Sequence, residues 1–196
     1  MSGKFSVNTA KSGDCLRDHF LLAMPRLSEG IFSQSITYIC EHGESGAMGI
    51  VINRPLDLSV SEIFEHLQIS TQRDFSEMPV MAGGPVQMDH GFVLHRYCDK
   101  TWEASVKITS EITLTTSRDI LRAIATDSGP SDHLIALGYA GWTAGQLEQE
   151  LAENSWLTLP GSSDIIFSTP ADQRLEAAAA QLGIDMNLIS GQAGHA

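Results

Sequence analysis

Cysteine is scarce in this sequence, and the few thiols do not form a recognisable pair. Cys15, Cys40 and Cys98 are the only three among 196 residues, and none of them shares a CxxC motif. An odd number of cysteines without such a motif is typical of reduced thiols in a cytosol rather than of a secreted disulfide framework. We therefore expect a cytoplasmic protein.

Long apolar runs are missing as well. The first apolar run covers only residues 20–24, and charged residues interrupt the segment before it, which argues against an export signal. No stretch approaches the roughly 20 apolar residues that cross a bilayer as a helix. The sequence therefore predicts no membrane segment.

Basic residues are few and unevenly distributed. Lys and Arg number 12 against 24 Asp and Glu, so the formal net charge is −12. After Arg122 the only basic residue is Arg174, although many acids lie in the same stretch. A phosphate-binding surface would have to work against this negative field. We expect no direct contact with nucleic acid or with an anionic membrane.

The length and the order of segments predict a single α+β domain. Residues 1–19 are polar and lack hydrophobic period, so we interpret them as a flexible leader, with one domain over residues 20–196. No repeat or linker divides this domain. Short apolar runs predict strands, and only short helices separate the first five of them, so strict βαβ alternation is broken. The predicted strands cover residues 20–24, 36–40, 48–52, 79–82, 92–94, 112–115, 134–139 and 165–167.

Capping patterns predict where several helices begin. A Ser or Thr followed three residues later by Glu or Gln is typical of a capping box. Trp142 before the last of these caps is expected to pack on Leu147 as a hydrophobic staple. The predicted N-caps are Ser59 with Glu62, Thr116 or Ser117, and Thr143 with Gln146.

Several segments in order resemble one family of bacterial proteins. They are FLLAMP (20–25), YICEHGESGAMGIVINRP (38–55), PVMAGGPV (79–86), GFVLH (91–95), LTTSRDIL (114–121), LGYAGWTAGQLEQEL (137–151) and LGID (182–185). The chain is similar to the AlgH/YqgE family over about residues 20–196. This resemblance implies a cytoplasmic α+β protein with a curled, bifurcated, mostly antiparallel sheet that forms a pseudo-barrel covered by a few helices. One branch is named as a regulator of alginate production, but the resemblance implies no particular reaction or cofactor.

The glycine-rich segment around Gly141, Trp142 and Thr143 is a candidate ligand site. It is predicted to join a strand to a helix, and free amides at a helix N-terminus can bind a phosphate or carboxylate. The segment lacks the lysine and the glycine spacing of known phosphate loops, and Thr143 and Gln146 can satisfy the same amides. The favoured alternative is that these residues have a purely structural role in a turn between a strand and a helix.

Two predicted turns are candidates for the rim of a cleft. Gly83 and Gly84 can bring the backbone close to a ligand. Arg54, beside Asn53, is held extended by the following proline and can contribute a guanidinium group that binds an anion. The simpler interpretation is a pair of turns that join strands.

Hydroxyl groups and one guanidinium meet at Thr116, Ser117 and Arg118. They form a candidate anion site, although capping explains the hydroxyls equally well. Arg118 in a first helical turn is unexpected, because the helix dipole favours acids there.

Cys40 and His42 are two residues apart, so on a regular strand they would share a face and form a thiol–imidazole pair. The alternative is a buried, inert cysteine, which is the commoner case. The seven histidines include no ligand pair at metal spacing, and no serine-hydrolase elbow is present, so neither a metal nor a cofactor is predicted.

We therefore predict a non-enzymatic regulatory protein that binds an unknown protein partner or a small ligand. Two alternatives stay open. One is a hydrolase or thiol-dependent enzyme built on Cys40 and His42 or on Ser117 and Arg118, and the other is an interaction scaffold with an exposed apolar patch.

Overall fold

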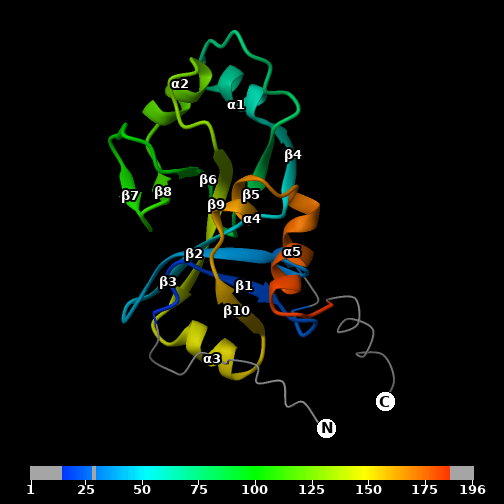
Figure 1. Cartoon of the computed structure of the whole chain (residues 1–196). Helices are drawn as coiled ribbons and strands as arrows, with labels where there is room; N and C mark the ends of the chain where they lie inside the picture. Colours follow the sequence, from blue (N-terminus) through cyan, green and yellow to red (C-terminus); the bar gives the residue numbers. More distant parts are fainter. Residues whose placement is uncertain (1–14, 28–29, 186–196) are drawn as a thin grey trace.

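The fold is built from ten strands and a few short helices (Figure 1). It is known from a computed structural model, which describes residues 15–27 and 30–185. The strands are β1 (His19–Ala23), β2 (Ile36–Gly43), β3 (Gly46–Val51), β4 (Pro55–Ser59), β5 (Pro79–Ala82), β6 (Val86–Arg96), β7 (Ser105–Lys107), β8 (Ile112–Thr115), β9 (His133–Thr143) and β10 (Trp156–Pro160). The helices are α1 (Val60–His66), α2 (Asp119–Ala125), α3 (Gln146–Ala152), α4 (Ser163–Phe167) and α5 (Arg174–Gln181), with 3₁₀ turns at Gly30–Phe32 and Ala171–Gln173.

Strand β9 is the point at which the sheet divides. One edge of β9 pairs with β6, and the other edge pairs first with β5, in parallel, and then with β3, antiparallel. The main order is β10-β1-β2-β3-β9-β6-β8-β7, and the antiparallel pair of β4 and β5, which α1 connects, branches from β9. Every pairing except β5 with β9 is antiparallel. The predicted α+β fold with a curled, bifurcated sheet is confirmed, and the sheet curls into a half-barrel.

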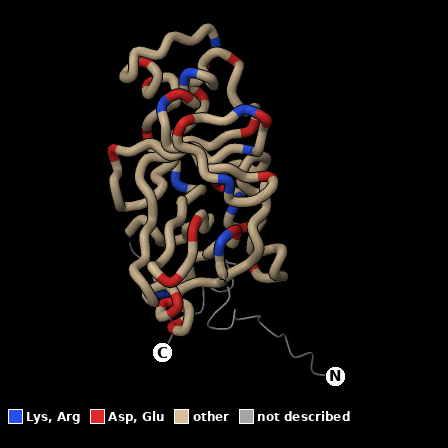
Figure 2. The backbone as a smooth tube through the Cα atoms, turned by 90° about the vertical axis from the view of Figure 1, so that its left-hand side faces the viewer, with Lys and Arg blue, Asp and Glu red and all other residues tan. Residues whose placement is uncertain are grey.

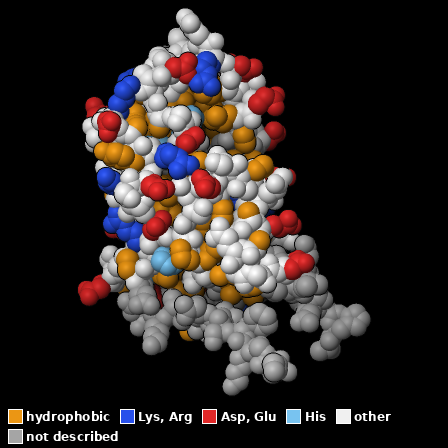
Figure 3. Space-filling model, viewed as in Figure 1, with side chains coloured by type: hydrophobic (Ala, Val, Ile, Leu, Met, Phe, Trp, Pro, Cys, Tyr) orange, Lys and Arg blue, Asp and Glu red, His pale blue; other side chains and the backbone are white. Residues whose placement is uncertain are grey.

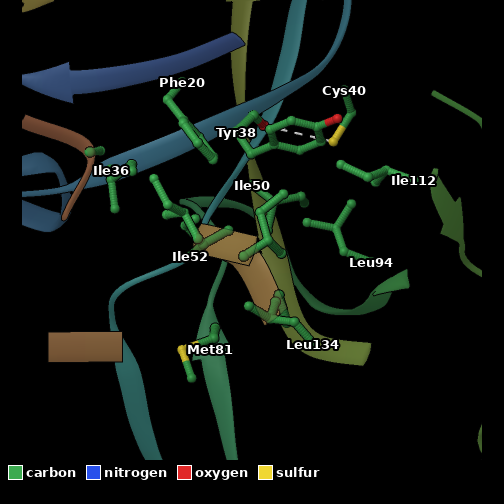
Figure 4. Packing of buried hydrophobic residues seen from close by; sticks show 14 of the residues in the cluster. Phe20, Ile36, Tyr38, Cys40, Ile50, Ile52, Met81, Leu94, Ile112 and Leu134 are labelled. Carbon is green, nitrogen blue, oxygen red and sulfur yellow. Dashed lines mark hydrogen bonds between the residues drawn. The ribbon is translucent and has the colours of Figure 1, made fainter. Parts of the chain in front are cut away.

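Buried side chains form three clusters around this sheet. The largest lies between the curled sheet and helices α4 and α5, and includes Phe20, Tyr38 and Ile50 (Figure 4). A second cluster, with Phe64 and Ile120, lies under α1 and α2, and a third packs α3 on the sheet through Leu147. Burying one large apolar side chain contributes about 1.5–3 kcal/mol, so these clusters are the main stabilising element of the fold.

The third cluster also contains part of the segment that we predicted as a leader. Leu16 is 2% exposed, and its backbone amide donates to Nδ1 of His42 at 2.9 Å. Residues 1–14 of that predicted leader lie outside the described residues.

Two of the three predicted N-caps are wrong. Ser59 forms the predicted capping box with Glu62, which confirms the start of α1. In contrast, β9 continues to Thr143, which is still paired with Gly46 of β3, so α3 begins only at Gln146 with Gly145 as its N-cap. The start of α2 differs too, because Asp119 opens the helix and neither Thr116 nor Ser117 caps it.

The run at residues 165–167 is not a strand. It belongs to α4, in which the hydroxyl of Ser162 accepts a hydrogen bond from the amide of Ile165 at 3.4 Å. A three-residue apolar run is too short to separate a strand from one turn of helix, and the N-cap decides it.

Candidate functional site

An open groove of about 690 Å³ lies where the β2–β3 hairpin, the end of β9 and the start of β6 meet. These segments are far apart in the sequence and become neighbours because β9 pairs with both β3 and β6. The groove is lined by Glu41, Ser45, Gly46, Ala47, Met48, Val86, Gln87, His90, Phe92, Thr116, Tyr139, Gly141, Trp142 and Thr143.

A wide bulge in β6 forms one side of the groove. Val86 pairs with Tyr139 and Gly91 pairs with Leu137, so four residues of β6 face a single residue of β9. Residues 87–90 therefore project from the sheet, and all four are exposed. Gln87 has a φ of 49°, an unusual backbone conformation for a residue other than glycine. Bulges of this kind commonly occur beside functional sites, where they redirect side chains.

A second bulge, in β2, shapes the opposite side. The pairing of β2 with β3 shifts between Ile39 and Glu41, so Cys40 is the extra residue. Cys40 is buried in the largest cluster, whereas Glu41 is exposed and lines the groove. The bulge thus places a carboxylate at the groove without burying it.

Polar side chains without partners surround an apolar floor. Met48, Phe92 and Tyr139 are half-buried or buried, and the rings of Phe92 and Tyr139 pack edge to face with centroids 5.6 Å apart. Within the described part of the chain, six groove side chains form no hydrogen bond or ion pair through their polar atoms. They are Glu41, Ser45, Gln87, His90, Thr116 and Tyr139.

Four of the ten candidate residues line this groove. Thr116 comes from the end of β8, and Gly141, Trp142 and Thr143 come from the end of β9. The predicted strand-to-helix turn at residues 141–143 is strand, so its amides are not those of a helix N-terminus. The other six candidates lie outside the lining.

Asn53 and Arg54 hold the connection between β1 and β2. The Oδ1 atom of Asn53 accepts from the amide of Ile36 at 3.0 Å, and its Nδ2 atom donates to the carbonyl of Gln34 at 2.9 Å. The guanidinium of Arg54 donates to the carbonyl of Ser33. Both side chains are thus used for the fold.

Gly83 and Gly84 lie where the sheet divides. The amide of Gly83 donates to Leu137 of β9, and its carbonyl accepts from Val51 of β3, both at 2.8 Å. A Cβ on Gly84 would lie 2.0 Å from the carbonyl carbon of Tyr139. Glycine is required here because two backbones touch, which is a structural role.

Ser117 and Arg118 do not form an anion site with Thr116. The hydroxyl of Ser117 accepts from the amide of Ala104 at 3.0 Å and donates to Asp119 at 2.5 Å. Arg118 is exposed, and its side chain has no partner in the region that the structure describes. Partial burial opposes ionisation of Asp119, but hydrogen bonds from Ser117 and from backbone amides hold the pKa of this carboxyl below its ordinary value. Such a carboxylate is a weak base for activating Ser117.

Cys40 and His42 point to opposite sides of β2, because the bulge at Cys40 breaks the two-residue alternation. Burial raises the pKa of the Cys40 thiol, which donates to the carbonyl of Tyr38 at 3.7 Å (Figure 4). His42 accepts from the amide of Leu16 through Nδ1 and donates through Nε2 to Glu148 at 2.8 Å. Both ring nitrogens are therefore occupied, and the predicted thiol–imidazole contact is absent.

Neither a metal cluster nor a membrane-spanning helix is found among residues 15–27 and 30–185. No group of three or more His, Cys, Asp or Glu side chains in these residues is placed to hold a metal ion. None of the described helices is long and apolar enough to cross a membrane.

The sequence analysis missed Glu41, Gln87, His90 and Tyr139 as groove residues. No residue type signals the bulge at Cys40. The only signal near the other bulge is the three polar residues Gln87, Asp89 and His90 that precede the apolar part of β6.

Comparisons with known proteins agree with the fold. A family model described as AlgH-like matches residues 20–187. A UPF0301 protein from Thioalkalivibrio sulfidiphilus is 56% identical over 91% of this chain and 96% of its own length. One from Saccharophagus degradans is 54% identical over 92% of this chain and 89% of its own length.

Two solved structures are similar over nearly the whole chain. The solution structure of the AlgH protein from Pseudomonas aeruginosa is 46% identical, covers 95% of this chain and 98% of its own, and has a TM-score of 0.77. The crystal structure of DIP2367 from Corynebacterium diphtheriae covers 97% of this chain and 99% of its own, with a TM-score of 0.73. Its identity is 16%, so this second likeness concerns the fold alone.

Proposed function

The chain belongs to the AlgH-like family, and we propose that it is a cytoplasmic, non-enzymatic regulatory protein that binds a small ligand or a segment of a protein partner in the groove between β2, β6 and β9. The observation that carries this proposal is the set of six groove side chains that have no partner in residues 15–27 and 30–185 and lie above an apolar floor. Binding sites combine an apolar surface with a few polar groups that orient the ligand.

The environment of the catalytic candidates supports binding over catalysis. A nucleophile needs an adjacent base and access to substrate. Cys40 is 4% exposed and its thiol donates to the carbonyl of Tyr38, while both ring nitrogens of His42 are occupied by Leu16 and Glu148. Ser117 faces a carboxylate whose pKa is low, outside the groove.

The basic side chains support action without direct DNA contact. Arg174 is 8% exposed, and Arg96 forms ion pairs with Asp132 and Asp164 at 2.9 and 3.4 Å. The Lys100 ammonium donates to the carbonyl of Ser128, and that of Lys107 lies 4.1 Å from the ring centre of Tyr97. Acidic and basic segments are interspersed along the backbone (Figure 2). Phosphate binding would need a continuous basic surface.

The exposed apolar residues give less support to a scaffold that binds through one large patch. On the face seen in Figure 3, hydrophobic side chains occur in small groups separated by polar and charged ones. The large exposed hydrophobic residues come from five separate segments: Leu56, Met88, Tyr97, Val106 and Leu182.

An NMR titration tests the groove. We expect 2-phenylethanol, a neutral aromatic probe, to shift the amide signals of residues 139–143 in a saturable manner. Ser45→Trp should block the groove and remove the shifts, whereas Ser76→Trp, at an exposed serine outside the lining, should retain them. Shifts that survive Ser45→Trp, or that never concentrate on these residues, would contradict the proposal.

A fluorescence anisotropy titration tests whether the protein acts without direct contact to DNA. We expect no saturable binding of labelled duplex DNA at micromolar protein in about 150 mM salt. Micromolar affinity with a steep salt dependence would show direct binding and overturn this part of the proposal.

A further inference from the structure

The lining of the groove contains an acidic residue and no Lys or Arg. Glu41 is the sole Asp or Glu in the lining. The formal net charge of the whole chain is −12. A field of this sign attracts cations and repels phosphates and carboxylates.

Glu41 has no counter-ion in the described residues. The charge of Arg17 reaches the Cys40 thiol next to Glu41. The Arg17 guanidinium donates to the carbonyl of Lys107. The Lys107 ammonium in turn lies over the ring of Tyr97. The carboxylate of Glu41 thus remains open to solvent at the edge of the groove.

Aromatic rings line the same groove. The ring of His90 lies 5.7 Å from that of Phe92, which packs on Tyr139. Faces of Phe and Tyr rings attract cations, and their apolar surface accommodates the carbon chain that carries the charge. A carboxylate beside aromatic rings is an arrangement suited to an amine or guanidinium.

We propose that the groove recognises a primary ammonium or guanidinium group carried on a short apolar body, with Glu41 as its counter-ion. This inference rests on the proposed function and names its ligand class. The cation comes either from a free small amine or from a Lys or Arg side chain of a protein partner.

Probes of similar size and different charge test whether the groove prefers a cation. The free-amine arm compares 2-phenylethylamine, 2-phenylethanol and 3-phenylpropionate, which carry positive, zero and negative charge on similar aromatic bodies. The side-chain arm compares acetyl-Phe-Arg-amide with acetyl-Phe-citrulline-amide, in which a neutral urea replaces the guanidinium. Dissociation constants come from the amide shifts of residues 139–143.

We expect the cationic probe of at least one arm to bind about threefold more tightly than its neutral partner, as for an exposed ion pair. Raising the salt concentration to about 0.5 M should remove most of this preference, because screening weakens exposed pairs. A preference in the first arm identifies a free amine as the source, and a preference confined to the second identifies a protein side chain.

Two variants locate the effect. Glu41→Gln should abolish the preference for the cationic probe over its neutral partner. Glu65→Gln, at an exposed position of α1, removes the same charge elsewhere and should retain the preference. Equal binding of charged and neutral probes in both arms, or a preference that survives Glu41→Gln, would overturn this inference while leaving the proposed function intact. Failure of every probe to reach the groove would overturn the proposed function itself.

Discussion

The two faces of the last segment of β9 differ in whether the polar groups beside them have hydrogen-bond partners. Ala140 and the indole of Trp142, a residue that also lines the groove, pack in the cluster with α3. One oxygen of Glu150 in this helix accepts hydrogen bonds from the indole of Trp142 at 2.9 Å and from that of Trp156 at 2.8 Å. The other oxygen accepts from Gln146 at 3.0 Å. This carboxylate joins helix α3 to strands β9 and β10.

The opposite face of the same segment borders the groove. Gly141 and Thr143 line it, and Glu41, the carboxylate on this side, accepts no hydrogen bond from the described residues. Polar groups inside a fold are normally paired, and unpaired groups in a concave surface are available to a ligand. The α3 face therefore supports the fold, whereas the Glu41 carboxylate beside the groove face has no partner among the described residues.

Two glycines should give the largest contrast. A Cβ at Gly84 would overlap the backbone of Tyr139 at 2.0 Å, whereas the nearest atom to a Cβ at Gly141 is a carbon of the Tyr139 ring at 3.2 Å. We expect Gly84→Ala to lower the free energy of unfolding by about 3 kcal/mol or to prevent folding. Gly141→Ala should cost less than about 1 kcal/mol, because a ring can move by a few tenths of an ångström. Urea denaturation measures both, and equal losses would show that the groove-lining Gly141 is packed as tightly as Gly84.

Two glutamates provide the next contrast. Glu150→Ala leaves two largely buried indole N–H groups without an acceptor, so we expect the free energy of unfolding to fall by about 2 kcal/mol. Glu41→Ala should change it by less than about 0.5 kcal/mol, because no partner is lost. Chemical denaturation with tryptophan fluorescence measures these values. A larger loss for Glu41→Ala would show that this residue also supports the fold.

Hydrophobic patterning was sufficient for most of the sheet and for one helix start. It missed β4, β7 and β10, since β7 has three residues with Val106 exposed, and β4 begins with a proline and has no buried residue. The Thr143 box was misplaced because pairing with β3 extends β9 through Thr143. Local capping signals do not reveal that tertiary pairing.

The candidate site was only partly predictable, for a related reason. Gly141, Trp142, Thr143 and Thr116 were identified from their turn chemistry, yet they meet because β9 pairs with both β3 and β6. Glu41 reaches the groove through a bulge, which reverses the alternation on which the Cys40–His42 hypothesis depended.

Acid should destabilise the interior through its histidines. His95 and His133 are paired across β6 and β9, and burial is the main cause that lowers the pKa of each. The charge of Arg73 lowers the pKa of His133 further, and that of Asp132 opposes this. The unfolded chain, with a histidine pKa near 6.5, therefore binds more protons as the pH falls, so stability decreases below about pH 6.5.

Urea denaturation at several pH values between about 7.5 and 5.5 measures this decrease, above the range in which carboxylates titrate. His95→Asn removes one of the two groups, and its stability should depend less steeply on pH than that of the wild type. An unchanged slope would show that His95 does not contribute.

Thr143 lines the groove but bonds to a residue of α3, and its replacement should have a small effect. Its amide and its hydroxyl donate to Oε1 of Gln146 at 3.0 and 3.2 Å, and the hydroxyl caps no helical amide. Thr143→Ala removes one exposed hydrogen bond and retains the amide contact, so we expect a loss of about 0.5 kcal/mol. Gln146→Ala removes both contacts with Thr143 and the one with Glu150, and should cost about 1 kcal/mol. If Thr143→Ala costs more than Gln146→Ala in urea denaturation, the hydroxyl acts as an N-cap in solution, and the end of β9 belongs to the structural face after all.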